Sequence, residues 1–325
     1  MNGNTLYEFL FGIKRVDVSC FALFAPFYAE RAKHYVYPVF YQSISQMIAA
    51  KGFFYKIFKK QGRSTLAIFK RSSIMGNYSV MLHIAPISLQ NNRQDEINII
   101  QEARKLGISL KICREDIQRY CIPIKLCEAI KGNVEYIYNV NECYNCKGGK
   151  FHGFRRQRTR ITRLSDYRHT EGVNSDIQPL VKKWDDHNHC ERDKSHQTSQ
   201  LSDWKNLEQT TINIKQVHIH SIYVGRTLEC FSVIEQLSPK HWAFVMGMRN
   251  YDSQLNDVNV CMHWLDCEIA HDDKQIAVYA NMGASLGIDG LSAAKEKLKP
   301  CAKQQIYKVA PVIKLDFQQV KQLFK

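Results

Sequence analysis

The stretch that decides the fold lies near the end of the chain, where residues 276–300 read IAVYANMGASLGIDGLSAAKEKLKP. Its first part, 276–281, is rich in β-branched and aromatic residues and predicts a strand. Residues 289–299 then predict a helix, which Pro300 ends. The glycines Gly283, Gly287 and Gly290 permit a tight turn between the two. Such a strand–turn–helix unit is typical of a layered α/β domain, and its turn can present backbone N–H groups to an anion or a developing oxyanion.

The rest of the chain extends this α/β pattern. In the first part we expect strands at 65–71, 78–85, 108–113 and 134–140, with helices at 94–107 and 114–121. In the second part we expect a helical segment within 177–209 and strands at 228–234, 242–249, 258–265 and 305–314. Residues 5–60 are rich in Phe and Tyr and predict a packed core, although the lysines among them leave contact with RNA bases or a membrane surface as an alternative.

Length and charge narrow the class of protein. A chain of 325 residues predicts two domains or one large one. The formal net charge is +14, and splitting the chain at residue 150 gives 21 basic and 11 acidic residues before it and 24 and 20 after it. This excess favours an anionic partner such as tRNA, another nucleic acid, an anionic lipid or a phosphorylated ligand, against the alternative of a merely basic protein.

The cysteine count, the N-terminal stretch and the length of the apolar runs bear on the cellular compartment of the protein. The odd number of cysteines, 11, in a chain too long to need disulfides predicts a reducing, cytoplasmic environment. Lys14, Arg15 and Asp17 interrupt the apolar N-terminal stretch, so we expect no signal peptide. No run of 18 apolar residues predicts a spanning helix, so any membrane contact is expected to be peripheral.

A cluster of arginines lies just before the midpoint of the chain. Six basic residues and no acid occupy positions 150–163. On a helix, Arg156, Arg160 and Arg163 share one face. Like charges this close repel one another, and a phosphate partner relieves that repulsion through the bidentate arginine fork. We therefore expect this segment to bind phosphate, against the alternative of a solvated helix paired to acids elsewhere; the residues concerned are Lys150, Arg155, Arg156, Arg158, Arg160 and Arg163.

Several motifs point to no specific chemistry. Cys143 and Cys146 have half the spacing of a zinc knuckle, and His187, His189 and Cys190 could complete a site, but no second CxxC exists and we expect no metal. His218 and His220 alternate on one strand face, which we expect to be partly exposed rather than ligating. There is neither GxxxxGK[ST] nor GxGxxG, so nothing supports a P-loop or Rossmann nucleotide site.

Two segments resemble a known family. Residues 135–164, EYIYNVNECYNCKGGKFHGFRRQRTRITRL, and residues 281–300 stand where the phosphatidylglycerol lysyltransferase C-terminal domain family has a basic helix and an Asn-Arg-Glu-x-Asp-Leu-Gly-Ile-x-Gly-Leu-Arg element. The strand HWAFVMGM at 241–248 also fits, and the resemblance extends over residues 12–310. Here the charged Arg, Glu and Asp of that element are replaced by Met282, Gly283 and Ser285, and the stretch 263–281 looks too short for the helix expected there.

The resemblance implies a fold and a reaction. The fold is tandem GNAT-like domains, each a mixed, mostly antiparallel sheet flanked by helices, which we place at 1–146 and 147–325. The reaction is transfer of an aminoacyl group from charged tRNA to a lipid, peptide or amine acceptor, with the aminoacyl-tRNA as co-substrate and no separate cofactor. A protein of this kind positions both substrates and stabilises a tetrahedral oxyanion.

The resemblance also assigns roles to residues. Asn281 and the backbone at Gly283 and Gly287 would face the reacting carbonyl, and Lys295 would neutralise developing charge. For the base, polarity and position rather than the resemblance indicate Asp266 or His263. The replaced charged residues keep open a second hypothesis, a non-catalytic subunit that binds nucleic acid or a protein partner. A third is an acyl-CoA N-acyltransferase, disfavoured because residues 104–109 match the acetyl-CoA loop pattern incompletely.

Overall fold

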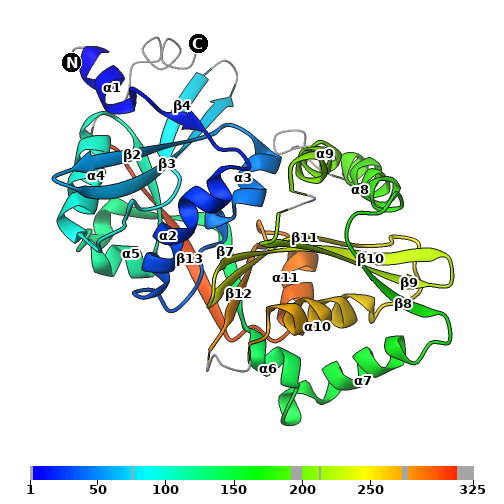
Figure 1. Ribbon diagram of the computed structural model, residues 1–325. Helices are drawn as coiled ribbons and strands as arrows, with labels where there is room; N and C mark the ends of the chain where they lie inside the picture. Colours follow the sequence, from blue (N-terminus) through cyan, green and yellow to red (C-terminus); the bar gives the residue numbers. More distant parts are fainter. Residues whose placement is uncertain (1–2, 75–76, 192–199, 212–213, 273–276, 313–325) are drawn as a thin grey trace. The chain divides into compact units, whose positions relative to one another are not determined.

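The structure is a computed structural model that describes residues 3–74, 77–191, 200–211, 214–272 and 277–312 (Figure 1). Contacts within the chain divide it into two compact units. The first comprises Met1–Val36, Lys51–Glu135 and Gln304–Lys325, and the second comprises Tyr37–Ala50 and Tyr136–Lys303. Each unit is therefore built from separated stretches of sequence.

The first unit is a sheet with helices packed on it. Its strands follow the order β1-β2-β3-β4-β6-β13, with antiparallel pairs throughout except the parallel pair β4 and β6. A core of apolar side chains from α1, α4 and the central strands lies between the layers. The elements are α1 (Gly3–Leu10), β1 (Lys14–Arg15), α2 (Cys20–Ala32), β2 (Phe53–Lys60), β3 (Arg63–Ile74), β4 (Asn77–Leu82), β5 (Ile87–Ser88), α4 (Arg93–Lys105), β6 (Ser109–Cys113), α5 (Arg114–Arg119), the 3-10 turn η2 (Ile124–Leu126), β7 (Cys127–Asn139) and β13 (Ala302–Val309).

A buried ion pair fixes α2 to α5 in this unit. The Arg31 guanidinium lies 2.8 Å from Oδ1 of Asp116. The Tyr35 hydroxyl donates to the same oxygen at 2.7 Å, and the Cys113 amide donates to Oδ2 at 3.0 Å. Both charges are almost fully removed from water, so each depends on the other for its compensation.

The second unit has helices on both faces of its sheet. The strand order is β7-β12-β11-β10-β9-β8, and β11 and β12 are parallel, while β8, β9, β10 and β11 pair antiparallel in sequence. Helices α8 and α9 cover one face and α10 and α11 the other (Figure 1). The elements are η1 (Phe40–Gln42), α3 (Ile44–Ala50), α6 (Val140–Asn145), η3 (Gly149–Phe151), α7 (His152–Thr162), β8 (Tyr167–Glu171), α8 (Ile177–Glu191), α9 (Gln200–Thr211), β9 (Val217–Val224), β10 (Thr227–Ser238), β11 (His241–Arg249), α10 (Val258–Ala270), β12 (Tyr279–Ala284) and α11 (Asp289–Lys297).

Burial along β10 follows from this arrangement. Phe231 and Val233 pack toward α8 and α9, whereas Cys230 packs toward α10. Because both faces are covered, the strand is buried almost continuously and does not alternate between apolar and polar residues. The carboxylate of Glu235, in the same strand, accepts hydrogen bonds from the Ser43 hydroxyl at 2.7 Å and from the Ile44 and Ser45 amides at 2.9 Å, which fixes the start of α3.

One predicted element is wrong. Residues 258–265 were expected to form a strand, and they lie in helix α10. The run VNVCMHWL is apolar on nearly every position, and a short run of this kind has no periodicity that separates a strand from a buried helix. The helix that seemed to be missing from residues 263–281 is therefore present and begins earlier.

The chain also crosses between the units at points other than the predicted boundary of residue 146. It enters the second unit within β7, at residue 136, and returns to the first within β13, at residue 304. Residues 37–50 belong to the second unit, because α3 packs against α9 and is capped by Glu235. A boundary read along the sequence does not capture this exchange of segments.

Candidate functional site

The turn between β12 and α11 is the first part of the candidate site. Oδ1 of Asn281 accepts the Gly283 amide at 2.8 Å, and its Nδ2 donates to the Pro38 carbonyl at 2.8 Å. Asn281 is completely buried. Gly283 has a φ of +70°, and a Cβ at this position would lie 3.2 Å from the Phe40 ring. The backbone conformation here thus requires glycine.

Lys295 closes this turn from the side of α11. Its ammonium donates to the carbonyls of Met282 at 2.7 Å, Gly283 at 2.9 Å and Ala284 at 2.9 Å. An ammonium has three protons, so these bonds occupy all of its donors. Gly287 lies in the same turn with a φ of +75°. Lys295 therefore acts on the backbone of the turn.

The arginine segment forms helix α7, as the sequence indicated, and three of its basic side chains contact the protein itself. Arg155 donates to the carbonyls of Cys146 and Gly148, Arg160 pairs with Asp257 at 2.6 Å, and the Arg158 guanidinium lies 4.4 Å from the Trp264 ring centre. Lys150, just before the helix, pairs with Glu142. These contacts join α7 to α6 and α10.

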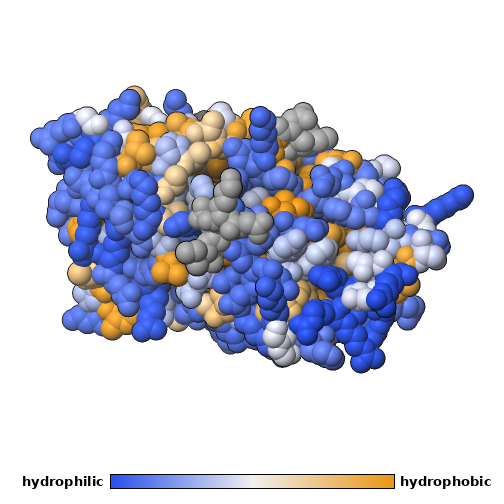
Figure 2. Space-filling view, turned by 60° about the horizontal axis from the view of Figure 1, so that its bottom comes forward, coloured by the Kyte–Doolittle hydropathy of each residue, from blue (hydrophilic) through white to orange (hydrophobic). Residues whose placement is uncertain are grey.

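Two arginines, one in α7 and one directly after its last residue, differ from the others. Arg156 and Arg163 are exposed, and no acidic residue in the described part of the chain forms an ion pair with either. Figure 2 brings the bottom of Figure 1, where α7 lies, toward the viewer, and hydrophilic residues predominate at its lower right. Arg156 and Arg163 are thus the guanidinium groups of this helix that remain available to a phosphate.

A row of stacked side chains lies beside α7. Trp264 stacks on Tyr144, with ring centres 5.9 Å apart, and Tyr144 stacks on His271 at 4.3 Å. Arg158 covers the other end of the row through its contact with Trp264. These side chains are all half-buried, and Arg158 connects the row to α7.

The two residues proposed as base lie on α10 and are buried. The Ser232 hydroxyl donates to Oδ2 of Asp266 at 3.0 Å, and burial raises the pKa of this carboxyl to about 7. Asp266 Oδ1 and His263 Nδ1 have no hydrogen-bond partner in the described residues. His263 packs edge-on against Tyr138, whose hydroxyl donates to the Lys295 carbonyl at 2.9 Å. Tyr138 therefore links α10 to α11.

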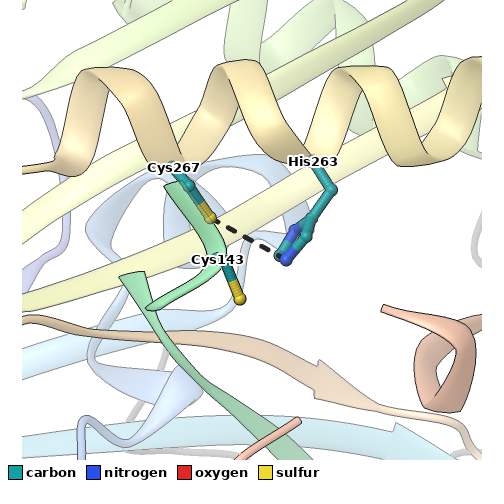
Figure 3. A group of neighbouring side chains, drawn as sticks. All are labelled: Cys143, His263 and Cys267. Atoms are coloured by element: carbon teal, nitrogen blue, oxygen red, sulfur yellow. Dashed lines mark hydrogen bonds between the residues drawn. The ribbon is translucent and has the colours of Figure 1, made fainter. Parts of the chain in front are cut away.

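Figure 3 shows a cluster that sequence reasoning missed. The Sγ atoms of Cys143 and Cys267 and one ring nitrogen of His263 all lie within 4.8 Å of one another. Cys143 comes from α6 and the other two from α10, where they are one helical turn apart. The hydrogen bond from the Cys267 thiol, and after it the hydrogen bond with His263, lowers the pKa of Cys143. Burial raises the pKa of Cys267. The i, i+4 spacing of His263 and Cys267 was the available signal, and the strand prediction for 258–265 concealed it.

The remaining His and Cys candidates do not join this cluster. His187 packs on Tyr251, and the side chains of His189 and Cys190 lie outside the described residues. His220 is buried, not partly exposed as predicted, and hydrogen-bonds His169 at 3.1 Å, while His218 stacks beside it. Burial, then the two neighbouring histidines, lowers the pKa of His220 to about 3, so it is neutral at physiological pH.

Comparison with known proteins gives matches of structure. No protein-family model matches the chain, and no curated protein matches its sequence. A conserved protein of unknown function from Bacteroides thetaiotaomicron VPI-5482 matches with a TM-score of 0.69 at 13% identity, covering 92% of this chain and 99% of its own. The C-terminal domain of a protein assigned as a lysylphosphatidylglycerol synthetase, from Agrobacterium fabrum, matches with a TM-score of 0.59 at 12% identity, covering 90% and 92%.

A tandem GNAT protein from the clavulanic acid biosynthesis pathway also matches, with a TM-score of 0.52 at 7% identity over 93% of this chain and 99% of its own. The fold predicted from the sequence, tandem GNAT-like domains with mixed, mostly antiparallel sheets flanked by helices, is thereby confirmed. The resemblance to the lysyltransferase family extends to the fold. Separately, none of the helices in the described ranges has the length and apolar character needed to cross a bilayer.

Proposed function

We propose that this protein is a GNAT-like acyltransferase that takes an aminoacyl group from charged tRNA and passes it to an amine, peptide or lipid acceptor. The observation that carries the proposal is the exposed pair Arg156, on α7, and Arg163, at its C-cap, without acidic partners among the described residues, in a chain of net charge +14. The fold shared with the C-terminal domain of the lysylphosphatidylglycerol synthetase supports the same class of reaction.

The proposed reaction needs little covalent chemistry from the protein. The acceptor nucleophile attacks the aminoacyl ester carbonyl and gives up a proton, and the ribose oxygen of the tRNA leaves with a proton. Catalysis then consists of positioning the two substrates and stabilising the oxyanion. Arg156 and Arg163 would hold the tRNA phosphates, the turn at Gly283 and Gly287 would lie near the reacting carbonyl, and Asp266 or His263 remains the proposed base.

Binding of tRNA over a salt series tests the first step. Each phosphate contact contributes about 0.7–0.9 to the slope of log K against log salt, so Arg156→Ala/Arg163→Ala is expected to flatten the slope by about 1.5. A control variant, Arg114→Ala/Arg226→Ala, removes the same charge from exposed positions on α5 and on the turn between β9 and β10. An equal effect of both variants would show that binding depends on net charge and not on Arg156 and Arg163. Absence of tRNA binding at low salt would contradict the tRNA proposal.

A transfer assay tests the second step. Mixed charged tRNA with labelled amino acids is incubated with vesicles containing phosphatidylglycerol, with peptides and with simple amines. Label in an acceptor, lost in the Arg156→Ala/Arg163→Ala variant, is the expected result. Binding of tRNA without transfer to any acceptor would contradict the enzyme proposal.

A second candidate function is a non-catalytic subunit that binds nucleic acid or a protein partner. The contacts of Asn281 and Lys295 favour it, because both side chains are buried and bonded to backbone groups. It predicts tRNA binding with the same arginine dependence and no turnover. A rise in melting temperature with acyl-CoA but not with tRNA would instead favour an acyl-CoA transferase.

A further inference from the structure

The cluster of Cys143, His263 and Cys267 has the donor atoms of a metal site. Each of the three side chains is at most 2% exposed, and each directs a sulfur or a nitrogen into the same small space (Figure 3). Thiolate and imidazole ligands select Zn²⁺ and other soft or borderline ions over Mg²⁺ and Ca²⁺. The chemistry of the cluster therefore restricts the class of ion.

The spacing of the atoms fits tetrahedral zinc. With Zn–S of about 2.3 Å and Zn–N of about 2.0–2.1 Å, a tetrahedral angle places a sulfur and a nitrogen ligand about 3.6 Å apart. The observed distance from Cys267 Sγ to His263 Nε2 is 3.8 Å. Zinc between Cys267 and His263 requires a shift of only a few tenths of an ångström in this pair, and the Sγ of Cys143 lies within 4.8 Å of both atoms.

Charge balance also favours zinc at this depth. Two thiolates carry the charge −2, and with Zn²⁺ and a neutral imidazole the complex is neutral, which removes the penalty for burying an ion. On binding, two thiol protons leave to solvent. Tyr138, Phe154 and Phe244 surround His263 edge-on, with ring centres 4.7, 6.0 and 5.4 Å away, and so exclude water.

We propose that Cys143, His263 and Cys267 bind one Zn²⁺ ion, with the fourth position held by a ligand other than these three. The ion joins α6 to α10 inside the second unit. Helix α6 ends at Asn145, and Cys146 follows it with a φ of +50°. The carbonyls of Cys146 and Gly148 accept hydrogen bonds from Arg155 of α7. Zinc at this site thus stabilises the start of the arginine helix α7, whether or not the protein transfers an aminoacyl group. Because the ion occupies the lone pair of His263, Asp266 is then the residue left for the role of base.

The test uses the full chain, purified under reducing conditions without chelator. Mass spectrometry of the metal content is expected to give one zinc per chain, and Co²⁺ substitution is expected to give a thiolate-to-cobalt charge-transfer band and tetrahedral d–d bands. Removing the metal with a chelator is expected to lower the melting temperature by about 5–10 °C, reversed by Zn²⁺. This comparison needs no variant and is independent of activity.

Variants then locate the ligands. Cys143→Ser and Cys267→Ser are each expected to abolish stoichiometric zinc, whereas Cys261→Ser, a buried thiol of α10 outside the cluster, is expected to retain it. Wild-type chain that binds no zinc or cobalt after reduction would overturn the proposal, as would retention of metal by both ligand variants. A stable Cys143–Cys267 disulfide in the protein as isolated from cells, seen as a mass lower by two hydrogen atoms, would overturn it in favour of a redox pair.

Discussion

Replacing Lys295 with methionine removes the ammonium that closes the turn between β12 and α11 and retains the length of the side chain. The three carbonyls of Met282, Gly283 and Ala284 then lose their donor. The first turn of α11 and the positive φ of Gly283 remain. We expect the variant to fold with a less stable second unit.

The magnitude follows from the exposure of the three acceptors. A hydrogen bond to a charged group contributes about 1.5–3 kcal/mol net. Only the Gly283 carbonyl belongs to a buried residue, whereas Met282 and Ala284 are half-buried and can turn to water. Counting the hydrogen bond to Gly283 in full and those to Met282 and Ala284 at about 0.5 kcal/mol each gives a loss of about 3 kcal/mol in the free energy of unfolding. For a unit of this size that corresponds to a melting temperature lower by about 6–12 °C.

The assay is thermal and urea unfolding followed by circular dichroism, with Lys297→Met as the matched control. Lys297 lies on the same helix and is exposed, so its replacement is expected to change stability by less than about 0.5 kcal/mol. A loss below about 1 kcal/mol for Lys295→Met would refute the reasoning. If Lys295→Met kept its stability but lost transfer activity, the Lys295 ammonium would act on the substrate rather than on the turn, as the sequence-based assignment predicts.

Two further perturbations test the turn and the buried ion pair. Gly283→Ala is expected to destabilise the protein by about 1–3 kcal/mol in urea unfolding, since φ is +70° and the Phe40 ring lies 3.2 Å from the new Cβ. Gly290→Ala is the control, since its new Cβ meets open space in α11, and it is expected to stabilise the protein by about 0.4–1 kcal/mol. Equal effects of the two substitutions would contradict the strain at Gly283. Asp116→Asn is expected to cost about 3–5 kcal/mol at pH 7, because Arg31 stays buried without its counter-charge. Burial alone raises the pKa of Asp116, but Arg31 and the hydrogen bonds outweigh it and lower the pKa overall. As the pH falls, Asp116 is therefore protonated in the unfolded state before it is protonated in the folded state. The wild type should then lose stability below about pH 4. A pH profile of urea midpoints that is no flatter for Asp116→Asn would show that Asp116 is not responsible.

The sequence predicted the elements whose signals are local. Residues 281–300 combine a strand, glycines and a helix ended by proline, and the structure has β12, the turn and α11 there. The arginines at 155–160 lie on a helix and Arg163 caps it, as their spacing indicated. In both cases the deciding residues are close together in sequence.

The parts that were missed depend on residues far apart. The contact of Cys143 with His263 and Cys267 spans more than a hundred positions, and the only local signal is the i, i+4 spacing of the latter two. Helix α10 was mistaken for a strand because burial on several sides removes the polar face that reveals a helix. The carbonyls that bind the Lys295 ammonium are backbone groups, so sequence assigned this side chain to chemistry and did not foresee its bonds to the turn.

Because the two units exchange segments of sequence, the order of synthesis on the ribosome affects the order in which they can fold. The first unit contains most of the N-terminal third of the chain, yet its strand β6 pairs with β13 near the end of the sequence. In this pair Leu110 lies opposite Val309 and Cys113 lies opposite Ile306. Until translation reaches residue 309, β6 has an open edge on this side, and an unpaired edge is a template for aggregation. The second unit, whose residues end at 303, has its whole sequence earlier. The part of the protein made first is thus the part completed last.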